Sequence, residues 1–139
     1  MGLIDLLVRH EGLKLEPYRC TSNKLTIGVG RNLEDCGITK EEAMYLLKND
    51  IQNFHEELLE RFYFYQYLEG ARKDAMLNLA FNMGVPRLAN FVKAIDFMSQ
   101  RKYEKAADEF LDSRWAEQVG NRATEVAQMI RTNKYPDRS

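Results

Sequence analysis

Apolar residues recur at helical spacing along most of the chain. The first stripe consists of Leu3, Ile4, Leu7 and Val8. Intervals of three and four residues predict an amphipathic helix over residues 3–11. Glu11 falls four residues after Leu7 and continues the apolar side, and Gly12 suits the left-handed residue that ends a helix. The pattern therefore predicts an acid at a helix end with two possible orientations: it faces inward and is partly desolvated, which suits a carboxyl group to donate a proton, or it turns to solvent.

Residues 17–30 replace the helical pattern with a hairpin pattern. Pro17 disfavours a helix interior, and PYRC and LTIGVG predict two short strands around the turn TSNK. Cys20 and Thr26 face the same way if they pair directly across this hairpin, and direct pairing needs a loop with an odd number of residues. Asn23 can adopt the left-handed conformation that a three-residue loop requires.

The second strand of this hairpin separates its side chains by size. Ile27 and Val29 point to one face, whereas Thr26, Gly28 and Gly30 point to the other. The face that carries Thr26 therefore lacks bulk, and we expect room for a ligand beside its backbone.

The rest of the chain predicts helices. Thr39 and Glu42 form a capping box at the start of a long helix over about residues 40–60. Further helices are predicted between Gly70 and Gly84, with a break at Val85-Pro86, and near 89–99, 103–112 and 121–132. The predicted fold class is α+β, mainly α. A small N-terminal lobe carries the hairpin, and the long helix leads from it into an all-helical C-terminal lobe.

Composition and charge agree with one folded domain. The chain has 139 residues, of which 45% are hydrophobic and 11% aromatic, so it can bury a core without disulfides or a metal. Residues 1–69 carry a net charge of -4 and residues 70–139 a net charge of +3, which sum to the formal charge of -1. We interpret this asymmetry as an uneven surface and expect no nucleic-acid partner.

Other classes of protein and site are disfavoured. No stretch reaches the roughly 18 apolar residues of a membrane-spanning helix, and an N-terminus with Asp5 inside its apolar run is a poor signal peptide. Two histidines and two cysteines lack a zinc spacing, and GVG at 28–30 lacks a phosphate-loop pattern. We therefore expect a soluble monomer made in a cytoplasm, without metal, cofactor or stable membrane insertion.

Two further features allow more than one interpretation. Cys20 is a buried apolar residue, a nucleophile paired with His10 or His55, or one member of a site with Thr26. Five aromatic residues follow the long helix, namely Phe62, Tyr63, Phe64, Tyr65 and Tyr67. We interpret this aromatic cluster as core and interlobe packing in preference to a surface for ligand stacking.

Glu11, Cys20 and Thr26 are separated by eight and five residues, within HEGLKLEPYRC and TIGVG. This spacing resembles that of the phage-type lysozymes, glycoside hydrolase family 24, whose pattern is Glu, eight residues, Asp or Cys, five residues and Thr. Downstream segments follow in the order of the family: GITKEEA at 37–43, FNMG at 81–84, SRW at 113–115, NRA at 121–123 and RT at 131–132. The resemblance covers nearly the whole chain.

The resemblance implies a muramidase that cleaves the β-1,4 bond between N-acetylmuramic acid and N-acetylglucosamine in peptidoglycan, with inversion. It implies one lysozyme-like domain over 1–139, with lobes at about 12–60 and 61–139 and the N-terminal helix 2–12 at the cleft. Glu11 would be the general acid. Cys20, at a position that is commonly Asp, would assist the attacking water as base or stabiliser, with Thr26 helping to hold that water.

The resemblance also implies residues that bind or orient the substrate. They are Arg31, Phe81, Asn82 and Arg122, the last of which matches an arginine that pairs with the catalytic acid. The implied biological role is lysis of a bacterial host by an endolysin that leaves the host cytoplasm through a holin-type pore. Two alternatives remain open, a non-catalytic peptidoglycan-binding module and a cysteine hydrolase that uses Cys20.

Overall fold

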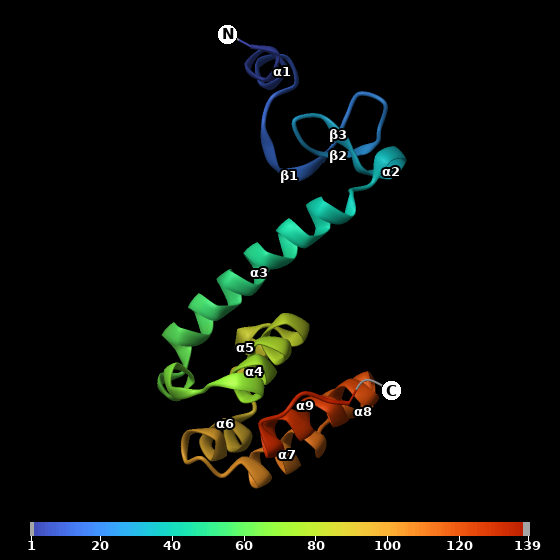
Figure 1. The fold of residues 1–139 in the computed structure, drawn as a ribbon. Coiled ribbons are helices and arrows are strands. Elements are labelled where there is room, and N and C mark those ends of the chain that lie inside the picture. Colours follow the sequence, from blue (N-terminus) through green and yellow to red (C-terminus); the bar gives the residue numbers. More distant parts are fainter. Residues whose placement is uncertain (1, 138–139) are drawn as a thin grey trace. The chain divides into compact units, whose positions relative to one another are not determined.

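The structure is a computed structural model that describes residues 2–137, and it divides into two compact units, residues 1–46 and 47–139. The first unit contains α1 (Leu3–Glu11), β1 (Lys14–Arg19), β2 (Leu25–Gly28), β3 (Arg31–Asn32), α2 (Leu33–Cys36) and the start of α3 (Lys40–Arg61) (Figure 1). The division falls inside α3. The predicted helices at 3–11 and 40–60 are confirmed, because their stripes and caps are local signals.

The three strands form an antiparallel sheet in the order β1-β2-β3, so β2 is central. The first strand begins at Lys14, earlier than predicted, because Pro17 is accommodated in an edge strand where its missing N–H breaks no ladder. The pairing of β1 with β2 is irregular between Lys14 and Tyr18, around that proline. The third strand is only Arg31–Asn32 and is too short to produce a sequence pattern.

A hydrogen-bonded cluster joins β3 to the start of α3. The predicted capping box is confirmed, since the Thr39 N–H donates to Glu42 at 2.8 Å and the Glu42 N–H donates to the Thr39 hydroxyl at 3.1 Å. The same Glu42 carboxylate accepts both arms of the Arg31 guanidinium, each at 2.9 Å. Arg31 also donates to the carbonyl of Gly37 at 3.1 Å. One carboxylate therefore caps a helix and anchors a strand.

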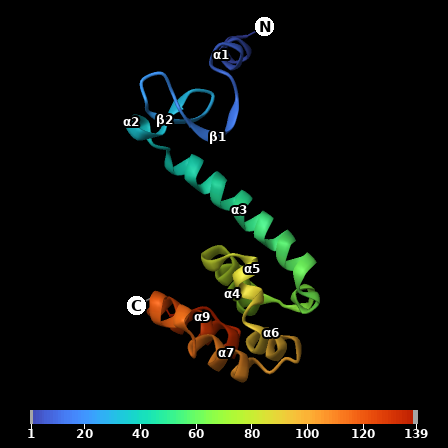
Figure 2. The ribbon, with the colours of Figure 1, turned by 180° about the vertical axis from the view of Figure 1, so that it is seen from behind.

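The second unit is helical. After the remainder of α3, its elements are η1 (Tyr63–Tyr67), α4 (Gly70–Met83), α5 (Val85–Ala89), α6 (Val92–Ser99), α7 (Tyr103–Leu111), α8 (Arg114–Val119) and α9 (Asn121–Thr132). Helix α7 packs against α6 and α9, and α4 packs against α9. Helices α7 and α9 lie side by side in both views (Figures 1 and 2). The predicted class, α+β and mainly α, is confirmed.

The apolar core lies in this helical unit. Among the described residues, every buried apolar side chain falls between Leu58 and Ile130 in the sequence. The largest fully buried side chains include Trp115, Tyr65 and Phe110. The core combines aromatic rings and aliphatic and methionine side chains with alanines that let helices approach closely.

Two helices differ from prediction. One helix was expected at 89–99, but the chain forms α5 and α6 there. Gly84, at φ 82°, ends α4, and Pro86 then lies in the first turn of α5, where a missing N–H leaves no intrahelical hydrogen bond unmade. Helix α8 was not predicted. It begins at Ser113, whose hydroxyl accepts from the Ala116 N–H at 3.2 Å.

The aromatic cluster after α3 is only partly a core feature. Phe62 and Tyr65 are buried, as predicted. Tyr63 and Tyr67, however, are 75% and 61% exposed. The interpretation as packing is therefore wrong for these two tyrosines. The reason is the 3-10 geometry of η1: with three residues per turn, Phe62, Tyr65 and Leu68 fall on one inner side, and Tyr63 and Tyr67 lie off that side.

We predict that the Glu42 cluster makes the first unit sensitive to acid. Arg31 first, and the Thr39 N–H next, lower the pKa of Glu42 from 4.5 to about 2. A lowered pKa contributes stability above the unfolded value that is lost as the pH falls toward the folded value. Glu42→Gln should therefore lower stability near neutral pH, modestly because both partners are about 40% exposed. The difference from wild type should close between about pH 4.5 and about pH 2.

The measurement is urea unfolding followed by circular dichroism across this pH range. Glu41→Gln is the matched control, because Glu41 is an exposed neighbour. A difference between Glu42→Gln and wild type that is the same at every pH would contradict the role given to the ionised carboxylate.

Candidate active site

Glu11 is the last residue of α1, as predicted, and it lies against the turn between β2 and β3. Helix α1 ends because Gly12 takes φ 81°, a conformation that favours glycine. A Cβ atom built on Gly30 would lie 3.0 Å from Oε2 of Glu11. The absence of a side chain at Gly30 therefore makes the place for the carboxyl group. Glu11 is exposed, so the structure agrees with the orientation toward solvent and not with the desolvated one.

The glycine face of β2 is only partly open. The space beside Gly30 is occupied by Glu11, whereas nothing lies within 4 Å of a Cβ built on Gly28. The room that the sequence predicted beside the backbone therefore exists at Gly28, and at Gly30 it is filled by the candidate acid.

Cys20 and Thr26 share a face of the hairpin, but through a different register from the one predicted. Thr26 pairs with Tyr18, and the Cys20 N–H donates to the carbonyl of Lys24 at 3.0 Å. Direct pairing of Cys20 with Thr26 is therefore wrong. Since Lys24 and Thr26 are two residues apart on one strand, Cys20 still lies diagonally across from Thr26 on the same face.

The turn that produces this register has the predicted left-handed residue. The Asn23 N–H donates to the Cys20 carbonyl at 2.8 Å, and Asn23 has φ 59°. This is a three-residue loop with a left-handed third position, a conformation that asparagine adopts more readily than most residues. The turn residues lie between Cys20 and Lys24, one step earlier in the chain than the loop of residues 22–24 that direct pairing of Cys20 with Thr26 would give.

Backbone N–H groups of the hairpin turn affect the Cys20 thiol. The N–H of Lys24 first, then that of Ser22, and the hydroxyl of Thr26 lower the pKa of the Cys20 thiol, while desolvation opposes them. Donors stabilise a thiolate more than a thiol, so the anion forms at a lower pH than in a free cysteine. Cys20 is partly exposed and Cys36 exposed, and both are free thiols.

Thr26 is held firmly. Its side chain is 3% exposed, and it is the one buried polar residue among residues 2–137. The hydroxyl donates to the carbonyl of Lys24 at 2.8 Å, and the same single proton must turn to the Cys20 sulfur for Thr26 to lower the pKa of that thiol. Thr26 presents its oxygen next to the sulfur of Cys20.

Arg31 does not join this group. It pairs with Ile27, whereas Thr26 pairs with Asn32, so Arg31 belongs to the opposite face of the sheet. Its guanidinium is bound to Glu42 in the cluster described above. The candidate substrate contact thus serves as a structural anchor within its unit.

In the second unit, Phe81 and Arg122 line one cavity of about 400 Å³. The Phe81 ring is 43% exposed and packs edge-on against Phe54, with ring centroids 5.6 Å apart. Arg122 is fixed by Asn78, since its Nε donates to Asn78 Oδ1 at 2.9 Å. The remaining lining includes the hydrogen-bonded pair Tyr135 and Asp74.

Sequence reasoning missed three polar residues of this cavity, namely Asp74, Asn78 and Tyr135. Asp74, Asn78 and Phe81 recur at intervals of four and three, so their common face on α4 was detectable from spacing. Tyr135 follows the last helix and belongs to no periodic stripe. Asn82, predicted to contact substrate, instead accepts a hydrogen bond from the Trp115 indole at 2.7 Å, which orients a buried side chain.

The part of the chain that the structure describes offers no metal site and no membrane span. Within residues 2–137 no three His, Cys, Asp or Glu side chains gather as metal ligands would. No described helix combines the length and apolar character needed to cross a bilayer.

Comparison with known proteins gives a consistent result. The sequence model of the phage lysozyme family matches residues 8–133. The chain is 29% identical to "Probable T4-type lysozyme 1" of Dictyostelium discoideum, in an alignment that covers 92% of each protein. It is 28% identical to "Probable T4-type lysozyme 2" of the same organism, over 94% of each. It is 29% identical to the "Pre-baseplate central spike protein Gp5" of Enterobacteria phage T4, over 95% of this chain and 28% of that protein.

A mainly helical fold with a small antiparallel sheet, and an acid at the end of the first helix, agree with a lysozyme-like glycosidase. The match over residues 8–133 shows that the chain belongs to the phage lysozyme family. The resemblance seen in the sequence is thereby confirmed, and peptidoglycan is the class of substrate.

We predict that Cys20 reacts as a thiol of lowered pKa. In a Cys36→Ser background, the alkylation rate of Cys20 by iodoacetamide should rise with a midpoint below that of the same protein unfolded in urea. Thr26→Val should move the midpoint upward, but only partly, because the backbone donors of Lys24 and Ser22 remain. A native midpoint equal to or above the unfolded one would show that these donors do not reach the sulfur.

Proposed function

We propose that this chain is a muramidase that hydrolyses the β-1,4 bond between N-acetylmuramic acid and N-acetylglucosamine with inversion of the anomeric centre. The observation that carries the proposal is the position of Glu11 against Gly30, in the unit whose hairpin brings Cys20 and Thr26 to one face. Membership of the phage lysozyme family supports the same assignment.

In the proposed reaction, Glu11 donates its proton to the glycosidic oxygen as the C1–O bond breaks. Water adds to C1 from the opposite face of the sugar and loses a proton, and solvent then reprotonates Glu11. Inversion requires a gap of roughly 6.5–9.5 Å between acid and base to hold that water. Exposure of Glu11 leaves its carboxyl group accessible to a substrate and to solvent protons.

We assign the water side of the reaction to Cys20, with Thr26 as its partner. The donors around the sulfur raise the fraction of thiolate, and a thiolate can accept a proton from water or orient it. The Thr26 oxygen, fixed through its hydrogen bond to Lys24, supplies a second acceptor. A base on this face fits the family pattern, in which Asp or Cys occupies the position.

The other four candidate residues have different roles in this proposal. We assign contact with substrate to Phe81 and Arg122, because an exposed ring and a fixed guanidinium line the same cavity. We assign only an orienting role to Asn82, whose amide oxygen is used by Trp115. Arg31 likewise acts by holding the sheet to α3.

The biological part of the proposal is bacterial lysis by a monomeric enzyme that reaches the wall from the host cytoplasm through a holin-type pore. It is supported by family membership. Expression in a bacterium with and without a pore-forming protein tests it, since lysis should require the pore.

We predict that Glu11→Gln retains the fold and loses nearly all activity on purified peptidoglycan. Glutamine has nearly the same shape but cannot donate the proton, and a lost general acid typically costs on the order of 100- to 10,000-fold in rate. The rate is measured by turbidity, and the products are assayed for new reducing ends and new amines. Glu16→Gln, an exposed acid on β1, is the control and should remain active. More than a tenth of the wild-type rate in pure Glu11→Gln would remove Glu11 from the mechanism.

We predict that Cys20→Asp remains active and that Cys20→Ala loses much of the rate. Aspartate is ionised at neutral pH and can orient water, whereas alanine offers neither charge nor hydrogen bond. Cys36→Ser controls for loss of a thiol and should keep full activity. New amines without new reducing ends would instead identify a cysteine hydrolase. Full activity in Cys20→Ala would mean that Glu11 works with another partner.

A further inference from the structure

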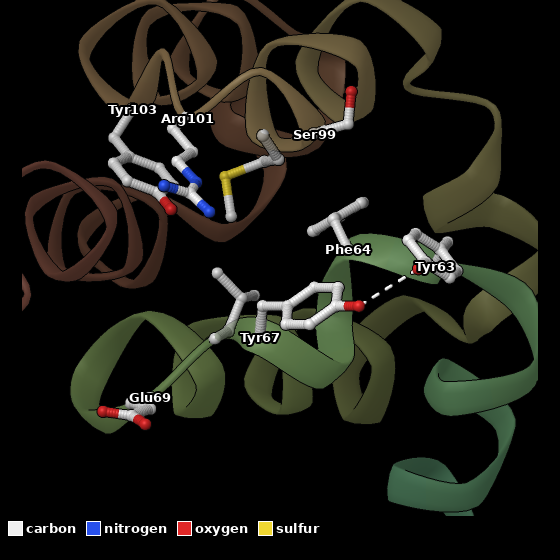
Figure 3. A pocket seen from close by; sticks show the side chains of 9 residues that line it. Tyr63, Phe64, Tyr67, Glu69, Ser99, Arg101 and Tyr103 are labelled. Atoms are coloured by element: carbon white, nitrogen blue, oxygen red, sulfur yellow. Dashed lines mark hydrogen bonds between the residues drawn. The ribbon is translucent and has the colours of Figure 1, made fainter.

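A second cavity, of about 550 Å³, lies on the helical unit between η1 and the turn that joins α6 to α7. Figure 3 shows Tyr63, Phe64 and Tyr67 on one side and Ser99, Arg101 and Tyr103 on the other. The remaining lining residues are Leu68, Glu69 and Met98. We call this the tyrosine pocket. It shares no residue with the cavity that contains Phe81 and Arg122.

The tyrosine pocket combines a buried apolar floor with exposed rings. Leu68 and Met98 are 7% and 1% exposed, so the base of the pocket belongs to the core. Tyr63 and Tyr67 stand out from it at 75% and 61% exposure. Two large rings left outside the core, next to space of this volume, offer flat apolar contact area at little cost in side-chain entropy.

The two rings are arranged before any ligand binds. They meet edge to face, with centroids 5.7 Å apart, and their hydroxyl groups are hydrogen-bonded at 3.0 Å. The backbone is also fixed, because the Gln66 amide donates to the carbonyl of Tyr63 at 3.0 Å. The hydrogen bond to Tyr63 raises the pKa of Tyr67, so the Tyr67 hydroxyl stays neutral and available to sugar hydroxyls at neutral pH.

The opposite wall supplies a cation. Arg101 takes φ 61°, a conformation that few residues other than glycine adopt, and within residues 2–137 it makes no ion pair. Tyr103 is held by the Arg72 guanidinium, which lies 3.8 Å from its ring centroid. A fixed ring and an unpaired arginine therefore face the two exposed tyrosines (Figure 3).

We propose that the tyrosine pocket is an accessory binding site for peptidoglycan strands, in which an acetamido sugar lies against Tyr63 and Tyr67 and a carboxylate pairs with Arg101. A pyranose ring has an apolar face of C–H groups that matches an aromatic ring and hydroxyls that match the phenol groups. Peptidoglycan also carries carboxylates, on its peptides and, where a peptide is absent, on the lactyl group of muramic acid, and Arg is suited to pair with them. This inference rests on the proposed function for its substrate class.

An accessory site has a physical consequence for an enzyme on an insoluble polymer. A second contact on the same strand converts re-binding after each cleavage into an intramolecular event at raised effective concentration. The tyrosine pocket therefore increases the time that the chain stays on the wall and takes no part in bond cleavage.

The test measures binding of the full chain to purified insoluble peptidoglycan in a Glu11→Gln background, so that the wall is not degraded. Tyr63→Ala with Tyr67→Ala should weaken binding about tenfold, the loss expected for two ring contacts. Tyr45→Ala, which removes an exposed tyrosine of the first unit (68% exposed), is the matched control and should bind as the parent does. Binding of the double variant within twofold of the parent would overturn the proposal.

Binding to two materials, peptide-free strands and intact peptidoglycan, identifies which carboxylate pairs with Arg101. Arg101→Gln should weaken binding to peptide-free strands if the lactyl carboxylate is the partner, and to intact peptidoglycan if the peptide carboxylates are. Lys93→Gln, which removes an exposed cation of α6, is the control for charge. An Arg101→Gln variant that binds both materials like the parent would remove the ion pair from the proposal.

A second measurement needs no substitution in the pocket. Hydroxyl-radical footprinting of the Glu11→Gln chain on peptidoglycan should protect Tyr63 and Tyr67 and leave Tyr45 reactive. Reactive Tyr63 and Tyr67 in the bound state would overturn the site even if the variants bind weakly through misfolding. Because both measurements record binding alone, they decide the tyrosine pocket whether or not Glu11 proves to be the catalytic acid.

Discussion

The first unit has almost no apolar core, and this shortage governs how its functional groups are held. Among residues 2–46 the one buried side chain is Thr26, because a segment this short cannot remove enough apolar surface from water. Hydrogen bonds and ion pairs hold the unit together instead. Arg31 forks onto Glu42, and Glu34 binds both Arg19 and the Leu25 N–H, so sheet, α2 and α3 are joined through charged groups.

A unit held this way depends on conformations that particular residues permit. Gly30 leaves the space that the Glu11 carboxyl group fills, and Asn23 accepts the left-handed turn that sets the hairpin register. The same turn aims backbone N–H groups at the Cys20 sulfur. Geometry and electrostatics of the candidate site thus have one local source, the short turns of the sheet.

The helical unit, in contrast, has a large apolar core. Its core is large enough to fix helices by packing, and polar groups on its surface are free to serve binding. Asn78 holds Arg122, and η1 turns Tyr63 and Tyr67 outward while Phe62 and Tyr65 pack inward. The protein therefore places its candidate reacting groups on a hydrogen-bonded scaffold and two candidate binding surfaces on an apolar one.

The sequence by itself determined the features that depend on near neighbours. Helical stripes located α1, α3, α4, α7 and α9, the capping box at Thr39 located the start of α3, and the spacing of Glu11, Cys20 and Thr26 indicated the family. Tertiary structure alone decided that Tyr18, not Cys20, lies opposite Thr26. It also decided that Arg31 binds Glu42 and that Asn82 accepts a hydrogen bond from Trp115. It also exposed Tyr63 and Tyr67. These outcomes depend on a bulge around a proline, on partners up to 33 residues apart and on the turn geometry of η1, and helical or strand periodicity contains none of that information.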